Sequence, residues 1–180
     1  MKVYRSLEQL PVFTKAVITI GTFDGVHLGH QHIIRQLLKE AITSGGESVL
    51  ISFYPHPRKV LQPEHHIAQL TTLDERIELL KKEGLDDLVV VQFNKDFSEQ
   101  TAEQYIKNFL VDRFHPSVII IGYDHKFGNK REGDYHLLEK MGEQYNYRVK
   151  EIPQQVLNEI AVSSTKIRQA LTNGNIEIAN

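Results

Sequence analysis

The chain has 180 residues, of which 41% are hydrophobic, and this size allows one domain with a single core. A formal net charge of −2 argues against a surface organised around nucleic acid, and the lack of cysteine excludes disulfides and thiol catalysis. No apolar stretch reaches membrane-spanning length and no hydrophobic signal segment opens the chain, so we expect a cytoplasmic protein that binds neither nucleic acid nor membrane.

Short β-branched runs alternate with amphipathic helical patterns along the chain. The predicted strands are Ala16–Gly21, Ser48–Tyr54, Asp87–Phe93, Ser117–Gly122 and Tyr147–Ile152. The predicted helices are Gly29–Thr43, Leu73–Glu83, Ala102–Phe114, Tyr135–Tyr145 and Ser164–Asn173. Continuously apolar runs such as 89–91 are typical of strands covered on both faces. This order predicts an α/β fold, a doubly wound, Rossmann-like parallel sheet of about five strands that forms one domain over residues 1–180.

The first predicted strand is joined to the first predicted helix by the segment GTFDGVHLGH, residues 21–30. Glycine lets backbone N–H groups approach an anion, and the first turn of a helix adds unpaired donors and partial positive charge. His27 and His30 are three residues apart, so both can face one side of that turn. We therefore predict a phosphate site with His27 and His30 as catalytic residues. Its expected nucleotide-binding residues are Gly21, Thr22, Phe23, Asp24 and Gly29.

The histidines of this loop also have two other interpretations, one structural and one as metal ligands. An apolar helical stripe from Ile33 to Ala41 extends to His30, which could therefore be a hydrogen-bonded residue at the edge of the core. A zinc site made of His27, His30 and His32 is disfavoured, because the chain has no cysteine and no matching acidic ligand nearby.

Polar segments follow the predicted strands rather than precede them. In a doubly wound sheet, ligands bind beyond the carboxyl ends of the strands. Segment 53–58 follows the second predicted strand, segment 122–133 follows the fourth, and segment 162–168 comes after the fifth. Together with the glycine and histidine loop, these segments predict the walls of one cleft.

The segment VSSTKIR, residues 162–168, is expected to begin a helix with Ser163 or Ser164 as its N-cap. Hydroxyls, orphan N–H donors and the cations of Lys166 and Arg168 at one helix start suit a polyphosphate. We expect Arg168 in the catalytic set and the following residues to bind the nucleotide: Ser163, Ser164 and Thr165.

Two further segments suit a flat ligand. Segment 54–57 is extended by its own stereochemistry, because each proline restricts the residue before it, and it is either a stiff connection or a rigid wall. After the fourth strand, Asp124 and Phe127 combine charge with an aromatic ring, which suits a ring with polar edges or a solvated loop. The candidate wall formed by the proline segment consists of Phe53, Pro55, His56, Pro57 and Arg58.

Five segments together carry a resemblance to a known family: 21–30, 53–57, 70–80, 122–128 and 163–168. In this order they resemble the adenylyltransferase module of bacterial FAD synthetases, within the H-x-G-H nucleotidylyltransferase superfamily. The resemblance implies transfer of AMP from ATP to FMN, with FAD and pyrophosphate as products. Mg²⁺ is expected to enter with ATP and to be held mainly by phosphate oxygens and water, with no direct protein ligand. Asp24 is either an indirect ligand of this ion or a residue that orders the glycine loop by accepting backbone N–H bonds. The flavin-binding residues that the resemblance implies are Phe53, Pro55, His56, Pro57, Arg58, Asp124 and Phe127.

The chain departs from that family in two respects. Bacterial FAD synthetases usually continue into a riboflavin kinase domain after the equivalent of residues 176–180, and we expect that domain and its activity to be absent here. Tyr54 stands where an acidic residue often precedes Pro-His-Pro. The alternatives are another H-x-G-H nucleotidylyltransferase, of the cytidylyltransferase or pantetheine-phosphate type, and a non-catalytic flavin or nucleotide sensor. A relative of aminoacyl-tRNA synthetases is disfavoured, because no further domain could recognise tRNA.

Overall fold

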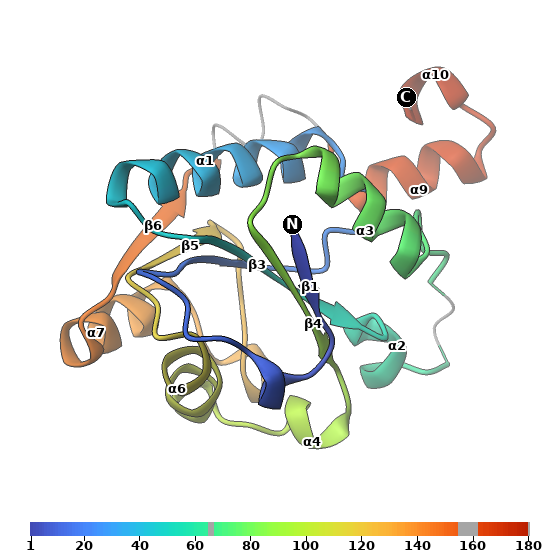
Figure 1. Ribbon diagram of the computed structural model, residues 1–180. Coiled ribbons are helices and arrows are strands. Elements are labelled where there is room, and N and C mark those ends of the chain that lie inside the picture. Colours follow the sequence, from blue (N-terminus) through green and yellow to red (C-terminus); the bar gives the residue numbers. More distant parts are fainter. Residues whose placement is uncertain (65–66, 155–161, 180) are drawn as a thin grey trace.

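The computed structural model describes residues 1–64, 67–154 and 162–179. Its centre is a parallel sheet of six strands in the order β1-β4-β3-β2-β5-β6 (Figure 1). The strands are β1 (Lys2–Tyr4), β2 (Val17–Ile20), β3 (Ser48–Tyr54), β4 (Asp87–Gln92), β5 (Val118–Gly122) and β6 (Arg148–Ile152). All five predicted strands are confirmed. The sixth, β1, was not predicted, and it pairs along the outer edge of β4.

Helices connect the strands and cover the sheet. They are η1 (Leu7–Gln9), α1 (Leu28–Ser44), α2 (Pro57–Leu61), α3 (Leu73–Lys82), α4 (Lys95–Ser98), α5 (Ala102–Gln104), η2 (Tyr105–Val111), α6 (Asp112–Phe114), η3 (Asn129–Arg131), α7 (Tyr135–Tyr145), α9 (Ser164–Thr172) and α10 (Ile176–Ala179). The five predicted helices are present, and one of them differs in kind. The segment predicted as one α-helix from Ala102 to Phe114 contains a π-helix, η2, between two short α-helical turns.

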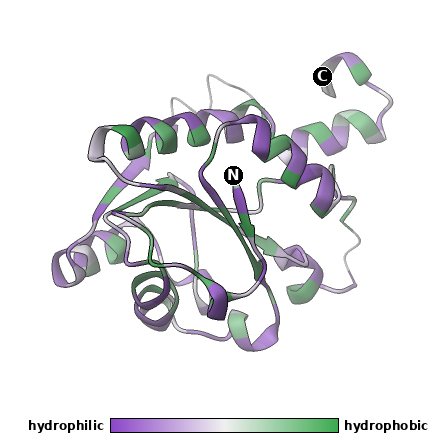
Figure 2. Ribbon diagram, in the orientation of Figure 1, coloured by the Kyte–Doolittle hydropathy of each residue, from purple (hydrophilic) through white to green (hydrophobic). Residues whose placement is uncertain are grey.

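The sheet separates two apolar layers. Figure 1 shows α1 and α3 on one side of it and α4, α6 and α7 on the other. Strand side chains alternate between the layers: in β5, Ile120 packs with the residues under α1 and α3, whereas Ile119 and Ile121 pack with those of η2 and α7. Figure 2 shows the strands as mainly hydrophobic and the covering helices as mixed. This is the arrangement expected of a doubly wound sheet.

The chain order creates a switch point next to β2. From β2 the chain moves through β3 to β4 on one side, and later through β5 to β6 on the other. Loops that leave the carboxyl ends of β2 and β5 therefore diverge there, which is where such folds bind ligands. Thr72 and Glu75 form a capping box at the start of α3, so the sequence fixes this helix start locally.

Candidate functional site

The loop between β2 and α1 is tightly bent. Gly25 has a φ of +83°, and a Cβ there would lie 2.7 Å from Cδ1 of Leu70. Phe23 and Val26 also have positive φ values, 50° and 39°, and both side chains are buried. The bend brings His27 to the N-cap of α1, where its side chain makes no capping hydrogen bond. The first N–H groups of this 17-residue helix thus face the loop without a side-chain cap.

His27 and His30 form the centre of this loop. Their rings are stacked, with centroids 3.7 Å apart, and the ring of Phe23 lies 5.0 Å from that of His30. Burial lowers the pKa of His27 to about 4, although the carboxylate of Asp24 opposes the shift. Burial also lowers the pKa of His30 well below its usual value, and His27 adds to this effect. Both imidazoles are therefore neutral at neutral pH, and each Nδ1 is buried without a hydrogen-bond partner among the described residues.

The start of α9 lies against the same loop. The Ser164 hydroxyl donates a hydrogen bond of 3.2 Å to the carbonyl oxygen of Asp24. A Cβ on Gly29 would lie 3.3 Å from the carbonyl oxygen of Val162, so the two chain segments are in close contact. Ser163 is the N-cap of α9, which is one of the two predicted positions. Its hydroxyl oxygen accepts a hydrogen bond from the N–H of Lys166. Two helix N-termini, those of α1 and α9, thus meet beside the histidines.

Asp24 is a fully buried carboxylate beneath this junction. It accepts hydrogen bonds from the N–H groups of Leu70 and Thr71 at 3.0 Å, and from the Arg168 guanidinium at 2.5 Å. Burial raises the pKa of Asp24, but these hydrogen bonds outweigh burial and hold the pKa below its usual value. Its oxygens are therefore occupied in holding segment 68–72 against the loop. This is the structural role that competes with its predicted part in nucleotide binding.

Arg168 completes a cluster of interacting residues around Asp24. Its Nε donates to the carbonyl oxygen of Ala68 at 2.8 Å, and its Nη2 contacts Asp24, while 19% of the side chain remains exposed. Ser163 and Thr165 are exposed at the same helix start. The cation is thus at the surface of the cluster, within the first turns of α9.

Arg76 belongs to the same cluster and was not predicted. Its side chain is 1% exposed, and its Nη2 forms an ion pair with Asp24 at 3.9 Å. It lies on α3, between the buried or half-buried apolar residues Leu73, Ile77 and Leu80. The signal in the sequence was a cation at an apolar position of an amphipathic helix, which requires a buried partner.

The proline segment after β3 brings His56 within electrostatic range of Arg168 and Asp24. The Tyr54–Pro55 peptide bond is cis, and His56 is the N-cap of α2, where its Nδ1 accepts a hydrogen bond of 3.1 Å from the Arg58 N–H. Burial lowers the pKa of His56 to about 4, and the charge of Arg168 contributes to the shift. Arg58 is exposed, and Pro55 and Pro57 are partly exposed.

Two aromatic residues that were expected to bind a flat ligand are packed in the core. Phe53 is 8% exposed and contacts the rings of Phe93 and Phe97. Phe127 is 6% exposed and stacks on Tyr105 of η2 at 5.1 Å. Asp124 is exposed in the loop before Phe127. The loop after β5 is therefore anchored on η2 and α5, whereas the glycine loop and the start of α9 meet at the histidines.

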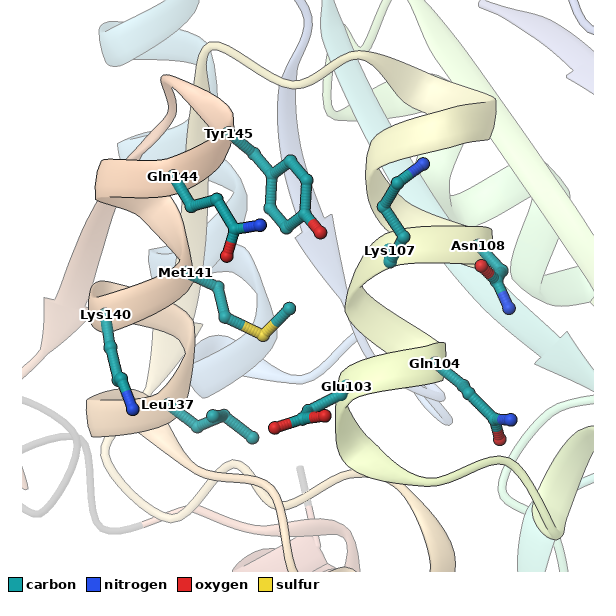
Figure 3. Close-up of a pocket in the computed structure, with 9 residues that line it drawn as sticks. All are labelled: Glu103, Gln104, Lys107, Asn108, Leu137, Lys140, Met141, Gln144 and Tyr145. Atoms are coloured by element: carbon teal, nitrogen blue, oxygen red, sulfur yellow. The ribbon is translucent and has the colours of Figure 1, made fainter.

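Surface grooves occur elsewhere. One of about 430 Å³ lies between the α5 and η2 segment and α7, where Lys107 faces the ring of Tyr145 (Figure 3). Another, of about 520 Å³, lies between β1 and α3. Neither groove contains a predicted site residue. Within the described ranges, no group of three or more His, Cys, Asp or Glu side chains is arranged to hold a metal ion, and no helix is long and apolar enough to span a membrane.

The chain resembles known proteins in both sequence and fold. The model of the family described as FAD synthetase matches residues 10–166. Bifunctional riboflavin kinase/FMN adenylyltransferases from Buchnera aphidicola (strain Sg) and Haemophilus influenzae are 38% and 34% identical over 99% and 93% of this chain. The chain spans only 58% and 54% of their lengths. A crystal structure titled as a macrolide-efflux protein from Streptococcus pneumoniae superimposes with a TM-score of 0.79 at 26% identity, over 98% of this chain and 59% of that one.

Proposed function

The chain belongs to the FAD synthetase family, and from that premise we propose that it is an FMN adenylyltransferase, which transfers AMP from ATP to FMN. The observation that carries this proposal is the meeting of the N-termini of α1 and α9 beside His27 and His30. Helix N-termini present N–H donors and partial positive charge, so two of them at one point suit a polyphosphate. Residues 1–180 would form this adenylyltransferase unit.

The reaction needs positioning more than covalent chemistry. A phosphate oxygen of FMN forms a bond to the α-phosphorus of ATP, and the bond from that phosphorus to the bridging oxygen breaks, so that pyrophosphate leaves with the electron pair. His27 and His30, being neutral, each donate one N–H to the α- or β-phosphate oxygens. Backbone N–H groups of the loop assist them.

The remaining nucleotide contacts come from both helix starts. Ser163, Thr165 and Arg168 bind the β- and γ-phosphates from α9, where all three are at least partly exposed. On the other segment, the backbone around Thr22 and Phe23 approaches the nucleotide. Gly21 and Gly29 allow that approach, and Ser164 holds the two segments together.

FMN would bind next to the proline segment and the loop after β5. His56 lies at the carboxyl end of β3, and Arg58 is exposed beside it, so these two residues are the polar contacts of the proposed flavin site. Pro55 and Pro57 are the apolar contacts. Asp124 is available from the next loop, whereas Phe53 and Phe127 would have to rearrange to expose their rings.

Mg²⁺ enters the proposal with ATP. The carboxylate of Asp24 lies beneath the loop, where it is buried and already hydrogen-bonded to segment 68–72 and Arg168, so it does not fit as a metal ligand. The ion would be held by phosphate oxygens and water, which is its usual preference. There it would neutralise negative charge on the phosphates. We place the reaction in the cytoplasm, where both ATP and flavin enzymes are available.

The test is to incubate the chain with FMN, ATP and Mg²⁺ and to separate the products by chromatography. We expect FAD and pyrophosphate. Riboflavin in place of FMN should give no FAD from the transfer of AMP, because riboflavin lacks the attacking phosphate. CTP in place of ATP measures the alternative nucleotide preference. Lack of FAD from FMN and ATP would contradict the proposed function, and binding of both ligands without turnover would favour the sensor.

A further inference from the structure

Arg76 is a buried cation with unused donors. Its side chain is 1% exposed, and its Nη1 donates to the Ser52 hydroxyl at 3.4 Å. That hydroxyl in turn donates to the carbonyl oxygen of Thr22 in the phosphate loop at 3.1 Å. The Nε and Nη2 atoms of Arg76 have no hydrogen-bond partner among the described residues. Because unpaired buried donors are costly, this arrangement calls for a reason.

The reason lies in the carboxylate that Arg76 shares with Arg168. Oδ2 of Asp24 accepts a hydrogen bond from Arg168 at 2.5 Å, whereas Nη2 of Arg76 stands 3.9 Å from Oδ1, too far for a hydrogen bond. Arg168 is 19% exposed and Arg76 is enclosed. Arg168 can therefore turn outward to a ligand, whereas Arg76 is enclosed and stays beside the carboxylate.

On the basis of the proposed function, we propose that Arg76 is a positioning residue that retains the charge of Asp24 when Arg168 turns to the phosphates of ATP. Without Arg76, transfer of Arg168 to the nucleotide would leave a buried carboxylate with no cation. Breaking such a buried pair is strongly unfavourable. With Arg76 in place, its free Nη2 takes over the charge, and Arg168 is available at little cost.

The test is a double-mutant cycle read by equilibrium binding of a non-hydrolysable ATP analogue. Arg76→Gln removes the enclosed cation and should weaken binding about tenfold, because Asp24 then retains Arg168. Asp24→Asn should bind at least as well as the wild type. Its amide oxygen can keep the contacts of Oδ1 to Leu70 and Thr71, while the amide nitrogen no longer holds Arg168. The double variant should recover the affinity lost in Arg76→Gln.

Controls separate positioning from stability. Leu80→Ala, on the same helix and fully buried, should lower the melting temperature and leave the affinity for the analogue unchanged. Arg76→Lys keeps a cation beside Asp24 and should stay within about threefold of wild-type affinity. If the single variant Arg76→Gln does not fold but the double variant does, the double variant should bind the ATP analogue as tightly as Asp24→Asn alone.

Wild-type affinity in Arg76→Gln, or no recovery in the double variant, would overturn the proposal. So would a tenfold difference between the double variant and Asp24→Asn. Because these measurements follow nucleotide binding without turnover, they remain informative even if the wild-type chain makes no FAD. Failure of the proposed function is recognised separately, from the wild-type products.

Discussion

The rings of His27 and His30 are stacked face to face with an interplanar angle of 21°. Two imidazoles so close repel each other when both are protonated, and burial further opposes protonation. The pair is thus poised as neutral donors in a site whose cations are arginines. In the proposed site, His27 and His30 would therefore act as neutral hydrogen-bond donors rather than through imidazolium charge.

His30→Ala should lower turnover far more than nucleotide affinity. If the imidazole acts mainly on the transition state, the loss of one donor costs on the order of 3 kcal/mol, or about a hundredfold in rate. Steady-state FAD formation measures kcat and KM separately. His32→Ala, two positions further along α1, is the matched control and should keep near-normal turnover. Equal activity of both variants would remove His30 from the catalytic set.

Arg168→Ala should raise the KM for ATP about tenfold, because a guanidinium that contacts the phosphates contributes to ground-state binding. Arg168→Lys should recover only part of the loss, since an ammonium group cannot reproduce two parallel hydrogen bonds. Arg113→Ala, an exposed cation of α6, controls for net charge. A normal KM in both Arg168 variants would show that the residue serves only to pair with Asp24.

Gly25→Ala should destabilise the fold by about 1–3 kcal/mol, through backbone strain at a φ of +83° and contact with Leu70. Gly45→Ala is a close control, because Gly45 has a φ of +62° but nothing within 4 Å of a new Cβ. It should cost about 1 kcal/mol from backbone strain alone. Urea unfolding of both variants measures the difference. A smaller loss at Gly25 than at Gly45 would mean that the loop relaxes around the added methyl group.

Stability should fall as the pH decreases from about 6.5 to 4. Burial lowers the pKa of His125 to about 4, so in this window the unfolded chain binds protons that the folded chain does not. His27 and His56 have pKa values shifted in the same direction. His125→Gln removes one such group outside the histidine pair and should make the decline of melting temperature with acidification shallower. His136→Gln, at an exposed position, should leave the slope unchanged.

Most of the fold followed from local pattern, and the exceptions have physical causes. Strand β1 has only three residues, too few to show a periodicity, and it is fixed by pairing with β4. The π-helix η2 was predicted as α-helix, because the apolar spacing of residues 105–110 fits either helix. Tertiary packing decides between them. Local helix propensity does not distinguish the wider turn of a π-helix from the turn of an α-helix.

The candidate site was predictable where residues follow strands and less so where charges pair at long range. The glycine loop and the start of α9 lie together as expected, because the topology brings them to one edge. The packing of Phe53 and Phe127 into the core was not foreseen, since an aromatic residue beside a loop looks the same in sequence whether it lines a ligand or fills a core. Arg76 was missed because its partner, Asp24, is on another element.

The pairing of Asp24 with Arg168 joins positions separated by 144 residues. During synthesis, the glycine loop and the central strands leave the ribosome long before α9 does. Until Arg168 emerges, Asp24 has Arg76 as the cation of its cluster, so Arg76 can keep the nascent domain from holding an isolated buried charge. Because α9 follows all six strands of the sheet in sequence, the pairing of Asp24 with Arg168 can form only after every one of these strands has been synthesised.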